Sequence, residues 1–197
     1  GNVGLKTSYG RWPVSGIFPL SPTLDTAGVL TRSVADAVTV FSAMDPHQRS
    51  YGPRLAREVS RCTPADFVIG TGERALWDDC DPGISETVDD ALKALGQAGV
   101  QTVSTPLPEA GPAIELLKVG SVVAAEIDEM LSSTAPQWRE TLDPVVSSRI
   151  RDGGSISASE YLHRRRRLRE LSHSAVQQFS SCQVMASPTV AISPPAV

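Results

Sequence analysis

The segment that most constrains the fold lies between residues 66 and 105, where two short apolar runs flank an amphipathic stretch. The first run, DFVIGT (66–71), is bounded by turn residues and predicts a β-strand. Apolar residues then recur at helical spacing, and Gly99 follows where a helix commonly ends on a left-handed glycine. VQTVST (100–105) predicts a second strand. A strand, a helix and a strand at this spacing indicate parallel neighbours in one sheet.

Other helices are predicted on both sides of this segment from local start signals and apolar stripes. Asp81-Pro82 predicts the start of the crossover helix, because proline fits the first helical turn. Ser33 is a typical N-cap, and Ser157 with Glu160 forms a capping box. The further elements expected are helices over 34–44, 109–133, 143–151 and from Ser157 to about residue 179, a polar connector over 45–64 and a strand over 182–187. The pattern is typical of an α/β protein.

Composition narrows the classes of partner and site. The net charge of −4 argues against nucleic acid as the main partner. No apolar run approaches the roughly 18 residues that a membrane-spanning helix needs, so no membrane association is expected. The three histidines lack the spacing of metal ligands, and no metal site is expected. The cysteines are few, odd in number and widely spaced, which favours a reducing cytoplasm: Cys62, Cys80 and Cys182.

Three local motifs have a structural interpretation that is preferred to the functional one. GTGERA (70–75) matches G-x-G-x-x-A, but the helix signals come later than a dinucleotide-binding turn requires. The basic run RRRRLRE (164–170) lacks the interleaved aromatic residues of a nucleic-acid surface, and ion pairing with acids across the fold is expected instead. In Gly-Gly-Ser-Ile (153–156) no lysine lies nearby to act as a base, so a loop entering the next helix is expected.

The first 36 residues resemble the signature stretch of the amidase signature family of serine hydrolases. The matching positions, at fixed spacing, are Gly1, Val3, Gly4, Leu5, Lys6, Thr7, Ser8, Gly10, Arg11, Gly16, Pro19, Leu24, Asp25, Gly28, Arg32, Ser33, Val34 and Asp36. The order of strand, Asp-Pro turn, helix and strand over 67–103 is also similar to the family, as is the strand that leads to Pro188-Thr189. The resemblance covers nearly the whole chain and implies a mixed β-sheet flanked by helices.

The resemblance implies hydrolysis of a carboxamide carbon–nitrogen bond by a serine nucleophile, a cis-serine and a lysine base, without a cofactor. In the family these three residues precede the Gly-Leu-Lys stretch, which here is Gly4-Leu5-Lys6. The triad is therefore expected ahead of Gly1, and Lys6 is not the catalytic lysine. Residues 1–197 are expected to be part of a single amidase domain that starts after the nucleophile segment and ends before the closing strands. The chain alone is expected to be inactive.

Segments that follow the signature contribute to the substrate pocket in the family. The candidate substrate-binding residues that this implies are Trp12, Ile17, Phe18, Trp138 and Arg149. Arg149-Ile150 resembles a pair that contributes a pocket arginine in the glutaminyl-tRNA amidotransferase branch, and such an arginine would favour substrates that carry a carboxylate. Surface ion pairing of Arg149 is the structural interpretation, and it is preferred to the pocket role. Asp25, in a Gly/Thr-rich turn, is expected to accept hydrogen bonds from backbone N–H groups and, with Thr26 and Gly28, to support the site.

The partners implied are a small-molecule amide, the remaining segments of the same amidase and a possible homodimer. Two alternatives from other functional classes stay open. The chain could be a non-catalytic subunit that completes a fold supplied by a second chain. It could also be a degenerate homologue with a structural or binding role.

Overall fold

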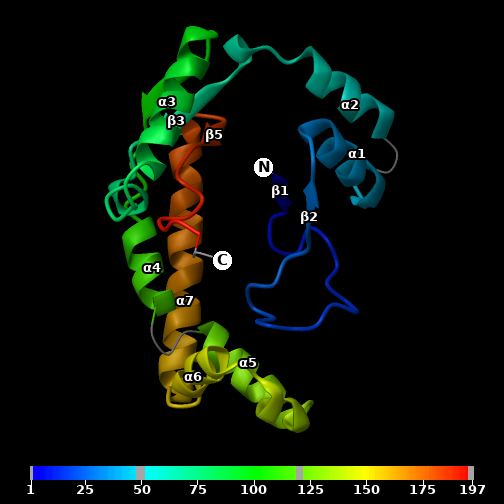
Figure 1. Ribbon diagram of the computed structural model, residues 1–197, viewed down its shortest axis with the longest axis vertical. Helices are drawn as coiled ribbons and strands as arrows, with labels where there is room; N and C mark the ends of the chain where they lie inside the picture. Colours follow the sequence, from blue (N-terminus) through cyan, green and yellow to red (C-terminus); the bar gives the residue numbers. More distant parts are fainter. Residues whose placement is uncertain (1, 48–51, 119–121, 195–197) are drawn as a thin grey trace. The chain divides into compact units, whose positions relative to one another are not determined.

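The computed structural model describes residues 2–47, 52–118 and 122–194 (Figure 1). The chain divides into two units, each of which has its own internal packing. The first unit comprises Gly1–Cys62 and Gly120–Ile156, and the second comprises Thr63–Val119 and Ser157–Val197. Helices and short strands occur in both, so the predicted α/β class is confirmed.

The second unit contains a three-stranded parallel sheet in the order β4-β3-β5. Its central strand β3 (Val68–Thr71) pairs with β4 (Gln101–Ser104) on one side and with the short β5 (Val184–Met185) on the other. Helix α3 (Ile84–Gln97) lies between β3 and β4 in the sequence. The parallel pairing predicted from the strand–helix–strand segment is therefore confirmed.

Of the two predicted ends of α3, the C-terminal end is confirmed and the N-terminal end is wrong. Gly99 has a φ of 108° just after the helix, as predicted for a glycine that ends a helix. The predicted start at Asp81-Pro82 is wrong, because the N-cap is Gly83 in the left-handed region with a φ of 93°. The Glu86 carboxylate accepts a hydrogen bond from the Gly83 N–H at 2.9 Å. The Asp81 carboxylate instead accepts one from the Ser193 N–H, at 2.7 Å.

Two helices of the second unit, α4 (Ala110–Lys118) and α7 (Ala158–Ala175), pack against each other (Figure 1). The Ser157 side chain accepts the Glu160 N–H, so the predicted N-cap of α7 is confirmed, whereas the Glu160 carboxylate, predicted to complete a capping box, accepts from Arg164 instead. The helix is shorter than predicted, since the chain turns into the 3-10 helix η4 (Val176–Ser180). Further 3-10 turns are η1 (Pro64–Asp66) and η2 (Arg74–Leu76), and the latter shows that GTGERA leads into a short turn and not directly into α3.

The arginine run on α7 forms ion pairs along its own helix. Arg164 Nε lies 2.6 Å from a Glu160 carboxylate oxygen. Arg167 lies 3.1 Å from Glu170, and Arg166 lies 3.8 Å from the same residue. Pairs three or four residues apart share one helix face, so these three contacts lie within the helix.

The first unit begins with an antiparallel pair, β1 (Val3–Lys6) and β2 (Gly28–Thr31). Helix α1 (Val34–Met44) follows with the predicted cap, in which the Ser33 side chain accepts the Asp36 N–H. Helix α2 (Gly52–Arg61) occupies part of the predicted connector; residues 48–51 of that connector lie outside the described residues. The segment that joins β1 to β2, residues 7–27, has no helix or strand and is here named the first loop.

The core of the first unit lies where α5 (Val122–Ser133) packs against α6 (Pro144–Gly153), with η3 (Pro136–Thr141) between them in the sequence. Its buried side chains are Ile127, Met130, Leu131, Ala135 and Ile150. The helix predicted over 143–151 is confirmed by α6. The single helix predicted over 109–133 is described as α4 and α5, with residues 119–121 outside the described residues.

Candidate functional site

The first loop is closed on itself by hydrogen bonds near its base and within its distal turn. Thr7 Oγ1 donates to the Ala27 carbonyl at 3.0 Å, and Tyr9 donates to the Pro22 carbonyl at 2.9 Å. Asp25 accepts the backbone N–H groups of Leu20 and Ser21, each at 3.0 Å. These local hydrogen bonds fix the conformation of a backbone segment that has no helix or strand.

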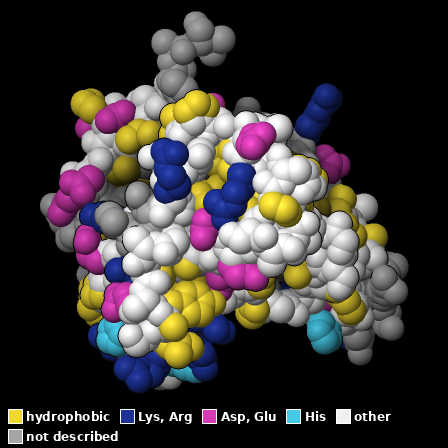
Figure 2. All heavy atoms as spheres, turned by 90° about the horizontal axis from the view of Figure 1, so that it is seen from below, with side chains coloured by type: hydrophobic (Ala, Val, Ile, Leu, Met, Phe, Trp, Pro, Cys, Tyr) yellow, Lys and Arg dark blue, Asp and Glu magenta, His cyan; other side chains and the backbone are white. Residues whose placement is uncertain are grey.

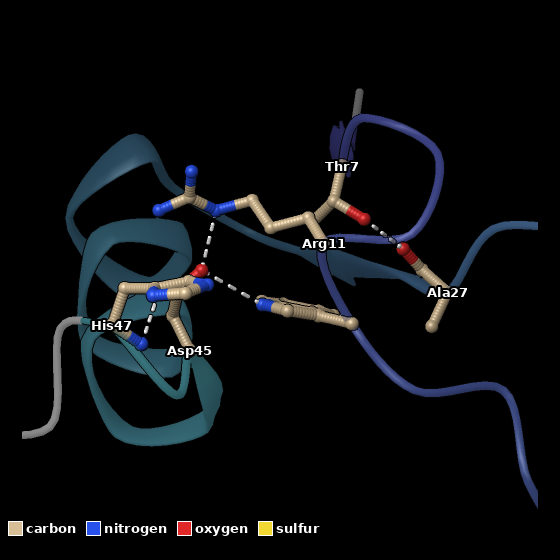
Figure 3. A network of polar contacts seen from close by, with 6 residues as sticks. Thr7, Arg11, Ala27, Asp45 and His47 are labelled. Atoms are coloured by element: carbon tan, nitrogen blue, oxygen red, sulfur yellow. Dashed lines mark hydrogen bonds and ion pairs between the residues drawn. The ribbon is translucent and has the colours of Figure 1, made fainter.

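One end of the loop is anchored on the C-terminus of α1 by a buried carboxylate (Figure 3). Asp45 has no exposed surface and accepts from Arg11 Nε at 2.5 Å and from Trp12 Nε1 at 3.1 Å. The backbone N–H of His47 donates to its other oxygen at 2.9 Å. Trp12 itself is only 4% exposed and lies against Phe41, with ring centroids 5.8 Å apart. Trp12 therefore lies in a buried network that fixes the loop.

The pKa of Asp45 reports on this anchor. Burial raises it, but the hydrogen bonds from Arg11, Trp12 and the His47 N–H, with the charge of Arg11, outweigh burial and hold the pKa below its ordinary value of 3.8. A lowered folded-state pKa contributes stability above the ordinary value, and that contribution is lost as the pH falls through the folded-state pKa.

We expect the unfolding free energies of wild type and Asp45→Asn to differ in their dependence on pH. The free energy of unfolding should be larger for wild type at higher pH, and this difference should shrink as the pH is lowered below 3.8. The reason is that only wild type carries a carboxylate that takes up a proton and so loses its charged hydrogen bonds. Denaturant unfolding of both proteins between about pH 6 and about pH 3 measures the difference. A difference that stays constant over this range would show that the carboxylate charge does not contribute.

A second anchor joins the distal part of the loop to α5. The Glu126 carboxylate accepts from Ser21 Oγ at 2.7 Å, from the Thr23 N–H at 3.0 Å and from Thr23 Oγ1. Ser21 is 1% exposed, so water does not compete for this contact. Neither Asp45 nor Glu126 was identified as a site residue from the sequence. Glu126 lies 105 residues from Ser21, and no local spacing signals such a pair.

Between these anchors the loop presents aromatic surface. The rings of Phe18 and Trp138 stack with centroids 5.3 Å apart and an interplanar angle of 29°. Phe18 is 50% exposed and Trp138 is 46% exposed, and Ile17 beside them is exposed as well. Figure 2 shows hydrophobic side chains that lie open among charged ones on one face of the molecule. The structure thus brings Phe18 and Trp138 together and gives them an outward apolar surface.

The other predicted residues lie at different places in the first unit. Arg149 is exposed on α6, and no ion pair of its side chain is found among the described residues. Thr26 is half-buried in the loop. A Cβ on Gly28 would lie 2.5 Å from the Leu5 carbonyl oxygen, so this position requires glycine for the β1–β2 contact. The described part of the chain contains no group of three His, Cys, Asp or Glu side chains placed to hold a metal ion.

The Gly-Gly-Ser-Ile segment lies at the end of α6. Gly153 is the last residue of that helix and packs directly on the backbone of α5 at Ala124. The segment then leads to the Ser157 cap of α7, as predicted. In the described ranges no helix is both long and apolar enough to span a bilayer.

Comparisons with known proteins place these features in a family. The family model described as Amidase matches residues 1–197. The chain is 40% identical over 195 residues to 2-amino-5-chloromuconic acid deaminase of Comamonas testosteroni, which is 99% of this chain and 41% of that protein. It is 37% identical over 109 residues to mandelamide hydrolase of Pseudomonas putida, which is 55% of this chain and 20% of that protein.

A solved structure also has this fold. It is described as a vestigial protein complex that reveals the evolutionary origins of an s-triazine catabolic enzyme. The match has a TM-score of 0.76 at 21% identity and covers 98% of this chain and 42% of that one. The chain thus spans about two fifths of the length of the Comamonas testosteroni relative and of this solved structure. With a family model that matches from the first residue to the last, the chain belongs to the amidase family.

Proposed function

We propose that the whole protein, meaning the complete product of the gene, cleaves the carbon–nitrogen bond of a small linear amide and releases ammonia. The observation that carries this proposal is the match of the amidase model to all 197 residues. The name of one relative, a mandelamide hydrolase, supports cleavage of an amide, and the name of the other, a deaminase, supports cleavage of a carbon–nitrogen bond. We further propose that both units belong to one amidase domain.

The mechanism proposed for the whole protein is acyl transfer through a serine. The serine oxygen attacks the amide carbon while a lysine takes its proton through a cis-serine, and backbone N–H groups stabilise the oxyanion. The protonated lysine returns the proton through the cis-serine to the nitrogen, which leaves as ammonia, and water then hydrolyses the acyl-enzyme to the acid. The nucleophile, the cis-serine and the lysine are proposed to lie outside residues 1–197.

The role proposed for this chain is to supply scaffold and one wall of the substrate pocket. The first loop supports this role because it is held at both sides, by Asp45 and by Glu126, and still exposes Phe18, which stacks on Trp138 of η3. A rigid aromatic surface binds an apolar substrate group at low entropic cost, since few side-chain torsions remain to be ordered. Ile17 would extend this wall. Asp25 would keep the loop turn in shape.

Arg149 is proposed to bind a carboxylate on the substrate. Its side chain is exposed, and a guanidinium forms charge-assisted hydrogen bonds to carboxylates. The relative from Comamonas testosteroni is named for an acid that it deaminates, which supports a substrate of this class.

Ammonia release by the purified whole protein tests both proposals. The panel should contain neutral aliphatic amides, aryl amides and amides that carry a carboxylate. We expect release from at least one class, and we expect Arg149→Gln to lower kcat/KM about tenfold to a hundredfold for carboxylate-bearing amides alone. Equal effects of Arg149→Gln on charged and neutral amides would exclude the carboxylate role. A folded whole protein that releases ammonia from none of them would contradict the function and favour a non-catalytic role.

A further inference from the structure

The second unit contains a cavity that is lined by residues of that unit alone. It lies between the start of α4 and the C-terminal half of α7 and has a volume of about 240 Å³. The residues that define its chemistry are Pro108, Glu109, Pro112, Leu171 and Ser174. Three of these five give it an apolar wall, and Arg167 and Glu170 complete the lining on the side of α7.

Glu109 is incompletely hydrogen-bonded. Its side chain is 8% exposed, and one carboxylate oxygen, Oε1, accepts from Ser174 Oγ at 2.5 Å. The other oxygen, Oε2, is buried and has no hydrogen-bond partner among the described residues. Buried carboxylate oxygens are nearly always paired, because their loss of hydration is otherwise uncompensated. The orphaned oxygen therefore points to a donor that the described residues do not supply.

The second carboxylate in the lining has no such deficit. Glu170 accepts from Arg167 at 3.1 Å, and Arg166 lies 3.8 Å from its other oxygen. The guanidinium of Arg167 is thereby engaged at the cavity, while Glu109 has no cationic partner in the described part of the chain. An occupant that complements this arrangement carries a positive N–H donor for Glu109 and an apolar portion for the proline and leucine surfaces.

We propose that this cavity binds a primary ammonium or guanidinium group on a short apolar stem, with an N–H donated to Glu109 Oε2. Two sources have this chemistry: a free small organic cation, and a lysine or arginine side chain from another part of the whole protein. The proposal is independent of the amide-hydrolysing function.

Titration of the whole protein with n-butylammonium, followed by NMR, tests the free source. Saturable shifts are expected, and Glu109→Gln should weaken binding at least tenfold, since it removes the charge and keeps the Ser174 contact. Tetramethylammonium has the same charge but no N–H, so it should bind at least tenfold more weakly to wild type. Glu115→Gln, at an exposed position of α4, the helix that begins just after Glu109, serves as the matched control and should leave binding unchanged.

A crystal structure of the whole protein separates the two sources. A lysine or arginine side chain seated against Glu109, together with no binding of n-butylammonium, would support the internal source. Binding of n-butylammonium at Glu109 would support the free source. The proposal is overturned if n-butylammonium does not bind and Glu109 Oε2 is bonded to a backbone N–H or lies in an empty cavity. Equal binding of the two ammonium ions would overturn it as well.

Discussion

The substitution Gly153→Ala is expected to force α5 and α6 apart and to lower the free energy of unfolding by about 3 kcal/mol. A Cβ at this position would overlap the backbone carbonyl group of Ala124 and would lie 2.5 Å from the backbone N of Ala125. Backbone atoms within a helix cannot move aside individually, so the added methyl group separates the whole helix pair. That pair contains the buried core around Leu131 and Ile150.

The neighbouring residue offers a matched control in the same chain. A Cβ on Gly154 would lie 3.1 Å from Asp128 Oδ2, which belongs to a side chain that can shift. Gly154→Ala should therefore cost less than about 1 kcal/mol, or be neutral, because alanine also restricts the unfolded chain. Denaturant unfolding of both variants of the whole protein measures the contrast. Similar losses in the two variants would show that the close approach of α5 and α6 is not what Gly153 provides.

Glu126→Ala is expected to release the first loop from α5 and to impair both stability and catalysis. The substitution removes the acceptor for three donors, two of them on Thr23 and one on the buried Ser21. Unsatisfied donors and lost charged hydrogen bonds together should lower the free energy of unfolding by about 2–4 kcal/mol. A displaced loop should also lower kcat/KM for amides about tenfold to a hundredfold, since small shifts of a pocket wall misplace the substrate.

Glu129→Ala is the control for that prediction. Glu129 lies on the same helix, is exposed and takes no part in anchoring the loop. Its replacement should change the free energy of unfolding and kcat/KM by only a small fraction of the changes expected for Glu126→Ala. Thermal unfolding and steady-state kinetics of Glu126→Ala and Glu129→Ala measure this contrast. Wild-type kinetics in Glu126→Ala would mean that the loop does not depend on this anchor or does not form the pocket.

The elements that could be predicted from the sequence are those fixed by interactions of short range. The caps at Ser33 and Ser157 and the left-handed Gly99 involve residues within a few positions of one another. The pairing of β3 with β4 also followed from a short strand–helix–strand spacing. Such features depend little on the rest of the fold, so local patterns suffice to indicate them.

What could not be predicted depends on partners that are distant in the sequence. Asp81 was expected to begin α3, but its carboxylate is engaged by the Ser193 N–H, and Gly83 takes the cap position. The anchoring of the first loop by Glu126 likewise requires the packing of a helix more than 100 residues away. The hydrogen bond from the Trp12 indole N–H to the buried Asp45 also joins residues 33 positions apart, and no local pattern indicates it.

Ammonia release by the whole protein and its Phe18→Ala variant tests most directly whether the chain forms a pocket wall in an amide hydrolase. The kinetics are measured with an arylacetamide and with acetamide. We predict turnover of a linear amide by wild type, and in the variant a roughly tenfold lower kcat/KM for the aryl substrate with little change for acetamide, because aromatic stacking contributes about 1 kcal/mol or more. No turnover by the folded wild type, or equal kcat/KM of both proteins for the aryl substrate, would contradict the account.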